Sequence, residues 1–270
     1  MANLSRRNLL KGAVAASTAG VISRAMADDE PDFKIKNARI KQSIMGWTFN
    51  PMPTEELAKH CRDLGMHAME GVDAKHYPMI RELGLKIALT GSHGFKDGPS
   101  NPANRAMCVA KIKEGIDKAV QFEAPSVITF TGYKVAGMTD EAMDKSCIET
   151  WKEVMPYAEE KKVTVVLEHL NSRDDSHPMK GHPGYFGDHV QIMDGDVIRH
   201  IRQYKDVTGH YHTAGVPGRG ELDETQELNY PPIVKAILET GYQGFMAQEF
   251  IPTWQDRVKA LRHAVRVCDV

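Results

Sequence analysis

Two glutamates of this chain stand where apolar segments end, positions that seldom carry a charge, and a histidine lies within another strand-like segment. Glu168 and Glu249 each close an almost wholly apolar run, and His212 lies within Gly209–Thr213. A buried carboxylate is costly unless it binds a metal, moves protons or pairs with a cation. Two carboxylates and an imidazole that converge suit a divalent cation such as Mn2+, Mg2+ or Co2+. We therefore expect a metal site, with the alternative of structural acids in ion pairs beside a core histidine.

Such a site would suit the chemistry of small hydroxy-carbonyl compounds. A divalent cation can hold two neighbouring oxygens and polarise the carbonyl, and a nearby carboxylate can then move a proton between adjacent carbons. Glu168 and Glu249 are the candidates for this proton transfer.

The elements that must position these residues alternate between strand and helix. From Phe33 onward, seven apolar segments have the pattern of strands, and a helical pattern follows nearly every one. The alternation predicts a parallel α/β fold, and at 270 residues a (β/α)8 TIM barrel. A doubly wound open sheet is the alternative, but the sequence lacks the G-x-G-x-x-G turn typical of it. The expected strands are 40–45, 67–71, 86–90, 126–130, 164–167, 209–213 and 244–248, and the expected helices are 54–64, 77–83, 102–122, 140–161, 195–204, 231–240 and 254–267.

In such a barrel the carboxyl ends of all strands meet at one mouth, where active sites are built. Further polar or aromatic residues fall at these ends, namely Trp47, Glu70, His93 and His210. We expect the chemistry of the protein at this mouth.

One stretch departs from the alternation. Residues 171–188 are rich in Asp, His, Pro and Gly and have no apolar periodicity, which leaves Val190–Met193 as the candidate for a sixth strand. The predicted barrel is therefore incomplete, about one α/β unit short.

The N-terminus has the pattern of an export signal. Arg6-Arg7 precedes a weakly apolar run and then Ala25-Met26-Ala27, an order that resembles a twin-arginine signal with its cleavage site. We predict a signal over residues 1–27, one domain over residues 28–270, and a periplasmic or other extracytoplasmic location. The run is too short and too polar for a membrane span.

The charge balance argues against nucleic acid as a partner. The chain has 34 basic and 36 acidic side chains, and four of the basic ones fall within residues 1–27. The remaining domain holds 30 basic side chains against 36 acidic ones, a formal charge of −6 that disfavours polyanions. A homo-oligomer is compatible with the sequence.

Five segments together resemble the hydroxypyruvate isomerase group of the xylose isomerase-like TIM-barrel superfamily. The resemblance implies a metal-dependent isomerase of the aldose–ketose type, acting on a small sugar or hydroxy-keto acid. The segments are V-V-L-E-H-L-N-S-R-D (165–174), H-V-Q-I-M-D-G-D (189–196), G-H-Y-H-T-A-G-V-P-G-R (209–219), Q-E-L-N-Y-P (226–231) and A-Q-E-F (247–250).

The resemblance also implies roles for single residues. Glu168, His212 and Glu249 match metal ligands, and the two glutamates match the pair that transfers the proton. The substrate-binding positions expected are His189, Arg219 and Asp174 from the resemblance, together with His93 after the third strand.

The sequence differs from the family pattern at strand six. The pattern F-D-x-Y-H-V-Q places a ligating Asp three residues before the histidine, where this chain has Phe186, with Asp188 as the available substitute. This difference motivates the alternative of a non-catalytic sugar-binding or degenerate barrel. An endonuclease IV-like repair enzyme is a third hypothesis, disfavoured by the export signal, the acidic domain and the smaller set of metal ligands.

Overall fold

The computed structural model describes residues 30, 32–168, 170 and 195–270. The chain divides into two units, Met1–Phe33 and Lys34–Val270, and the described strands and helices all belong to the second unit. Several predictions lie outside the described residues: the export signal, the candidate strand Val190–Met193, and the site residues Asp174, Asp188 and His189.

All the strands in the described part of the chain pair in parallel. Five form a sheet in the order β3-β2-β1-β7-β6, and β4 pairs with β5. A single bridge from Thr90 to Val127 links the end of the β3 segment to β4 and makes the two sheets continuous. The strands are β1 (Lys41–Met45), β2 (Ala68–Glu70), β3 (Lys86–Ile87), β4 (Ser126–Phe130), β5 (Thr164–Glu168), β6 (Tyr211–Thr213) and β7 (Phe245–Gln248).

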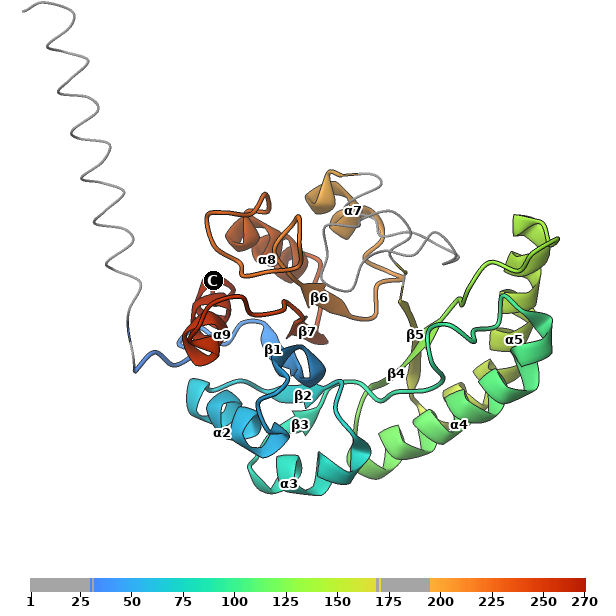
Figure 1. The fold of residues 1–270 in the computed structure, drawn as a ribbon, viewed down its shortest axis with the longest axis horizontal. Coiled ribbons are helices and arrows are strands. Elements are labelled where there is room, and N and C mark those ends of the chain that lie inside the picture. The colour runs from blue at the N-terminus through green and yellow to red at the C-terminus, as the bar shows by residue number, and fades with distance from the viewer. Residues whose placement is uncertain (1–29, 31, 169, 171–194) are drawn as a thin grey trace, which may run out of the picture. The chain divides into compact units, whose positions relative to one another are not determined.

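Helices cover the outer side of this curved sheet (Figure 1). The ends of the described strands and helices lie within three residues of those expected from the sequence. Short 3-10 turns occur at Gly46–Phe49, Ala74–His76 and Pro102–Asn104. The helices are α2 (Thr54–Leu64), α3 (Tyr77–Glu82), α4 (Arg105–Phe122), α5 (Asp140–Lys161), α7 (Val197–Gln203), α8 (Tyr230–Glu239) and α9 (Arg257–Val267).

Small side chains make room for one aromatic ring in the interior of the sheet. Phe245 packs with Ala68 and Ala88, and all three are buried. Ser43 pairs in register with Ala68 on one side and with Ala247 on the other, so these side chains share the inner face. The apolar layer lies at the start of the strands and leaves their carboxyl ends free for polar groups.

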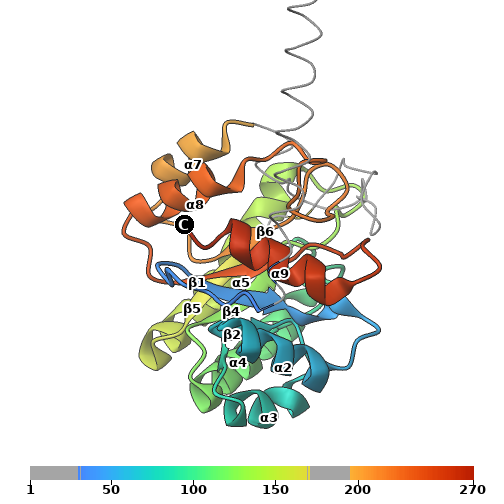
Figure 2. The same ribbon diagram turned by 90° about the vertical axis from the view of Figure 1, so that its left-hand side faces the viewer.

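The last helix, α9, packs against both the sheet and another helix of the outer layer (Figure 2). It lies against β7 and α2, and the buried Gln42 of β1 donates its Nε2 hydrogen to the Val265 carbonyl at 2.9 Å. Within the described residues, every helix is too short or too polar to cross a bilayer. All four cysteines are buried free thiols.

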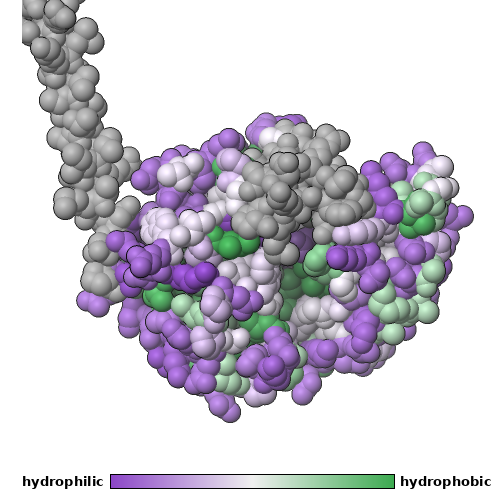
Figure 3. All heavy atoms as spheres, in the orientation of Figure 1, coloured by the Kyte–Doolittle hydropathy of each residue, from purple (hydrophilic) through white to green (hydrophobic). Residues whose placement is uncertain are grey.

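Strand β5 is less covered than its neighbours. Parallel strands are normally buried on both faces, yet Leu167 is 37% exposed, whereas Val127 of the paired β4 is fully buried. The chain entering β6 lies against β5, because a Cβ at Gly209 would come within 2.6 Å of Val166 Cγ1. Apolar side chains also reach the surface over α4 and α5 (Figure 3), where Met107, Val120 and Ile148 are partly exposed.

Candidate functional site

Strands β5, β6 and β7 bring Glu168, His212 and Glu249 together. Glu168 is the last residue of β5, His212 lies in the middle of β6, and Glu249 directly follows β7. The Glu249 N–H donates to the Thr213 carbonyl at 2.8 Å, which continues the β6–β7 pairing to the point where the carboxylate leaves the strand. Ligand atoms of the three side chains all lie within 4.8 Å of one another. The structure thus assembles the cluster that the sequence predicts.

His212 lies between two carboxylates. Its Nδ1 is 3.1 Å from Glu249 Oε2, and its Nε2 is 2.8 Å from Glu70 Oε1. Burial alone would disfavour the charged ring, but the two carboxylates outweigh it and hold the pKa of His212 well above its ordinary value. Without a metal, the imidazole is therefore protonated and accounts for one positive charge in the site.

The two glutamates have opposite protonation behaviour. Burial, reinforced by the charge of Glu249, raises the pKa of Glu168 to about 7. Burial acts in the same direction on Glu249, but His212 and Arg219 outweigh it and hold the Glu249 pKa well below its usual range. Glu249 is ionised near neutral pH, while Glu168 can hold or release a proton there.

Arg219 forms one wall of the site. Its guanidinium pairs with the Glu249 carboxylate, and its Cζ lies 5.4 Å from the centre of the Trp47 ring. The backbone of Arg219 is left-handed, with φ of 56°, and its carbonyl accepts from the Ile251 N–H at 2.7 Å. The loop after β7 therefore holds this arginine in a conformation that is uncommon for a residue other than glycine.

Glu221 anchors the loop that carries Arg219. Its buried carboxylate accepts from the Thr253 N–H at 2.6 Å, the Thr253 hydroxyl at 2.8 Å and the Trp254 N–H at 2.9 Å. The sequence offered no means of assigning this role, since the contact joins segments about 32 residues apart.

His93 makes contacts of a different kind. The ring is buried, with Nδ1 3.0 Å from the Gly94 carbonyl and Nε2 2.9 Å from Thr129 Oγ1. The same Thr129 hydroxyl accepts from the Trp151 indole of α5 at 3.2 Å. The structure thus places His93 beside Thr129, and substrate binding by this residue stays a prediction.

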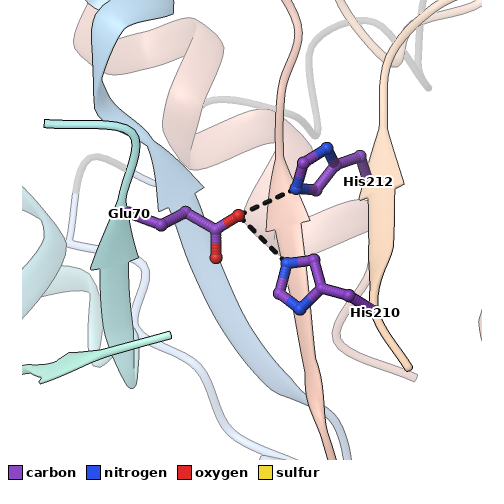
Figure 4. A group of neighbouring side chains, drawn as sticks. All are labelled: Glu70, His210 and His212. Carbon is purple, nitrogen blue, oxygen red and sulfur yellow. Dashed lines mark hydrogen bonds and ion pairs between the residues drawn. The ribbon is translucent and has the colours of Figure 1, made fainter. Parts of the chain in front are cut away.

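Glu70 and His210 extend the cluster beyond the predicted ligands. Glu70 ends β2 and is fully buried, and His210 directly precedes β6. Figure 4 shows one Glu70 oxygen facing a nitrogen of each ring, at 3.0 Å from His210 and 2.8 Å from His212. These histidines lower the pKa of Glu70 to about 2 against the opposing effect of burial. The available signal was that Glu70 ends a buried strand, as Glu168 and Glu249 do.

The donor set suits a divalent cation. Two carboxylates and one imidazole are ligands that Mn2+, Co2+ and Mg2+ accept in proteins. Glu168, Glu249 and the Nδ1 of His212 would hold the ion, because the Nε2 is already engaged by Glu70. Arg219 and Trp47 lie beside this position, where a small oxygen-rich compound could be bound.

The sequence is similar to that of several sugar-acid isomerases, although no family model matches it. A human protein named putative hydroxypyruvate isomerase is 42% identical over 64 residues, which make up 24% of this chain and 23% of that protein. The chain thus matches about a quarter of the length of that protein. A 2-oxo-tetronate isomerase of Pectobacterium atrosepticum is 24% identical over 238 residues, or 76% of this chain and 88% of that protein.

Solved structures with the same fold include sugar epimerases and an AP endonuclease of family 2. L-ribulose 3-epimerase superposes with a TM-score of 0.64 at 19% identity, covering 84% of this chain and 92% of that one. An AP endonuclease of family 2 from Brucella melitensis gives 0.67 at 22% identity, covering 80% and 94%. Likeness at this level of identity shows the fold alone. Together the comparisons confirm the (β/α) barrel and the resemblance to the hydroxypyruvate isomerase group.

Proposed function

We propose that the protein is an isomerase of small hydroxy-carbonyl acids, which interconverts hydroxy-aldehyde and hydroxy-keto forms by moving a proton between adjacent carbons. The observation that carries the proposal is the pair formed by Glu168 and Glu249. The environment raises the pKa of one carboxylate to about 7 and lowers that of the other. Two acids whose pKa values are pushed apart in one site are typical of general acid–base catalysis.

Each residue of the cluster has a role in this proposal. Glu168 takes the proton from the hydroxyl-bearing carbon next to the carbonyl and returns it to the former carbonyl carbon, while the hydroxyl proton passes to the former carbonyl oxygen. Glu249 stays ionised, oriented by Arg219 and His212. A divalent cation held by Glu168, His212 and Glu249 would supply polarisation of the substrate carbonyl. Arg219, beside Trp47, is placed to contact substrate oxygens.

The names of the related proteins support the substrate class. Hydroxypyruvate and 2-oxo-tetronate, which appear in those names, are both short 2-oxo acids with a neighbouring hydroxyl-bearing carbon. A guanidinium can bind the carboxylate of such an acid, and a divalent cation can bind its two neighbouring oxygens. We therefore propose a short hydroxylated 2-oxo acid as the substrate.

Solvent exchange of the substrate hydrogen tests this function. The protein is incubated in D2O with Mn2+ and either hydroxypyruvate or 2-oxo-tetronate, and NMR follows deuterium uptake at the carbon next to the carbonyl. We expect uptake above the protein-free rate, reduced by about 10²–10⁴-fold in Glu168→Gln because the base is removed.

The matched control is Glu224→Gln, since Glu224 is an exposed glutamate of the loop after β6. This variant is expected to exchange hydrogen as the unmodified protein does. Binding of either acid with no exchange at any metal concentration would contradict the isomerase and leave the sugar-binding alternative. Equal exchange in Glu168→Gln would contradict the role of this glutamate.

A further inference from the structure

Glu70 is a buried carboxylate on the inner face of the sheet. Among the described residues, its partners are hydrogen-bond donors from two histidines and one serine. Its Oε1 accepts from the Nε2 atoms of His210 and His212, and its Oε2 accepts from the Ser43 hydroxyl at 3.2 Å. The side chain is fully buried. A carboxylate in such a place is costly unless its oxygens are satisfied. Losing the two histidine bonds would leave the charge uncompensated, so the three side chains depend on one another.

The hydrogen bond from His212 decides which ring nitrogen is available for another partner. An ionised carboxylate only accepts hydrogen bonds, so the Nε2 of His212 carries the hydrogen. A ring that binds an ion is neutral and carries one hydrogen. With that hydrogen on Nε2, the lone pair lies on Nδ1. That atom is the one 3.1 Å from Glu249 Oε2, on the side where the ligand atoms converge.

The geometry also fixes the plane of the ring. Glu70 belongs to β2, and β1 and β7 stand between β2 and β6 in the sheet, so its side chain reaches across the interior to the histidines (Figure 4). The His210 ring packs edge-on against the His212 ring, with centroids 4.9 Å apart and planes at 90°. His212 is therefore held by its own strand, by Glu70 at one ring nitrogen and by packing against the His210 ring.

We propose that Glu70 is the positioning residue of the metal site: it holds His212 in the Nε2-protonated form, with Nδ1 directed at the ion. The inference rests on the proposed function, because it concerns the same ion. It goes beyond that function by assigning a role to a residue outside the three proposed ligands. Carboxylates that orient a ligating histidine in this way commonly change metal affinity by about 10–100-fold when they are replaced.

Metal affinity measured without turnover tests the proposal. The dissociation constant of Mn2+ is measured for the full chain and for Glu70→Gln, which keeps the size of the side chain and removes its charge. We expect about a 10–100-fold weaker affinity in Glu70→Gln. The control is Glu82→Gln, at an exposed glutamate that ends α3, and it should leave the Mn2+ affinity within about threefold.

A second measurement needs no variant and does not depend on how Glu70→Gln folds. Nitrogen-15 NMR of the Mg2+-loaded protein reports which nitrogen of His212 carries hydrogen, and therefore which nitrogen faces Glu70 and which faces the ion. Nε2 protonated, with Nδ1 free of hydrogen, is the expected result. Hydrogen on Nδ1, or unchanged Mn2+ affinity in a folded Glu70→Gln, would overturn the role of Glu70 alone. Failure of the unmodified protein to bind Mn2+ would instead overturn the proposed metal-dependent function, and the positioning role with it.

Discussion

Glu168 is set apart from the other carboxylates of the site by what surrounds it. Glu249 has Arg219 and His212 as direct partners, and Glu70 has two histidines, whereas Glu168 lies in the same buried region without an ion pair among the described residues. Burial and the Glu249 charge therefore raise its pKa to about 7, and His212 and Arg219 offset this only in part. A carboxylate that is neutral as often as charged near pH 7 is suited to exchange a proton with substrate.

The protonation of Glu168 predicts how pH affects the stability of the metal-free protein. The folded pKa of about 7 lies above the ordinary value of 4.5, so the folded chain binds more protons than the unfolded chain between these pH values. The contribution of Glu168 to stability therefore falls as pH rises through this window. Gln does not titrate, so the melting temperature of Glu168→Gln relative to the unmodified protein should rise by about 5 °C from pH 5 to pH 8, measured with EDTA present.

The comparison isolates Glu168 because the groups that face it, Glu249, His212, Arg219 and Glu70, are present in both proteins. The same pH series on Glu224→Gln should give a constant difference, since that side chain is exposed. A constant difference for Glu168→Gln as well would mean that the carboxylate is ionised throughout this pH range.

For single residues, the sequence predicts the candidate ligands but not the residue that holds one of them in position. Glu168 and Glu249 are recognisable because each closes an almost wholly apolar strand, and His212 because it lies within a neighbouring predicted strand. The contact of Glu70 with His212 joins residues 142 positions apart and crosses the interior of the sheet. No local pattern encodes that distance, so the role of Glu70 depends on the fold.

Strand β5 is less buried than its paired neighbour β4. The outward side chain Leu167 is 37% exposed although its strand is parallel, whereas Leu89, near the carboxyl end of the third strand segment, is 3% exposed. Burial on both faces needs an outer layer, and β5 has less of it than the strands covered by α2, α3 or α9. The hydrophobic contribution of its outer face is correspondingly small.

Matched leucine truncations test this difference. Leu167→Ala should lower the free energy of unfolding by about 1 kcal/mol or less, because the side chain gives up little buried surface. Leu89→Ala should lower it by about 2–4 kcal/mol, because it leaves a cavity in a packed layer. Urea denaturation measures both values. Equal losses would indicate that β5 is covered in solution as fully as its neighbours.

The sequence predicts most elements because alternating apolar periodicity and turn residues are local signals. Strands such as Ser126–Phe130 and Gly244–Gln248 lie within one residue of the observed β4 and β7. The pairing order is not local: the bridge from Thr90 to Val127 that joins the two sheets depends on how α4 packs on β4. The sequence therefore predicts the alternation of strands and helices, whereas the exposure of β5 follows only from the structure.

On the scale of the whole 34–270 unit, one carboxylate joins its first segment to its last. Asp269 accepts from the N–H groups of Lys36, Asn37 and Ala38 at 2.7–3.1 Å, and the Asn37 side chain donates to the Asp269 carbonyl at 2.8 Å. These residues are more than 230 positions apart in the chain. The contact closes a loop that includes every strand, and its entropic cost is met only when the unit is folded.

Replacing this carboxylate should therefore destabilise the unit as a whole. Asp269→Ala removes the acceptor of three backbone N–H groups, and we expect the free energy of unfolding to fall by about 1–3 kcal/mol, with exposure of the site limiting the loss. Urea denaturation monitored by tryptophan fluorescence gives the value. Asp206→Ala, at an exposed aspartate of the loop after α7, should change it by less than about 0.5 kcal/mol. Equal effects of the two replacements would show that water replaces the Asp269 contacts at no cost, and the ends of the barrel would then be joined by the packing of α9 on α2 and β7.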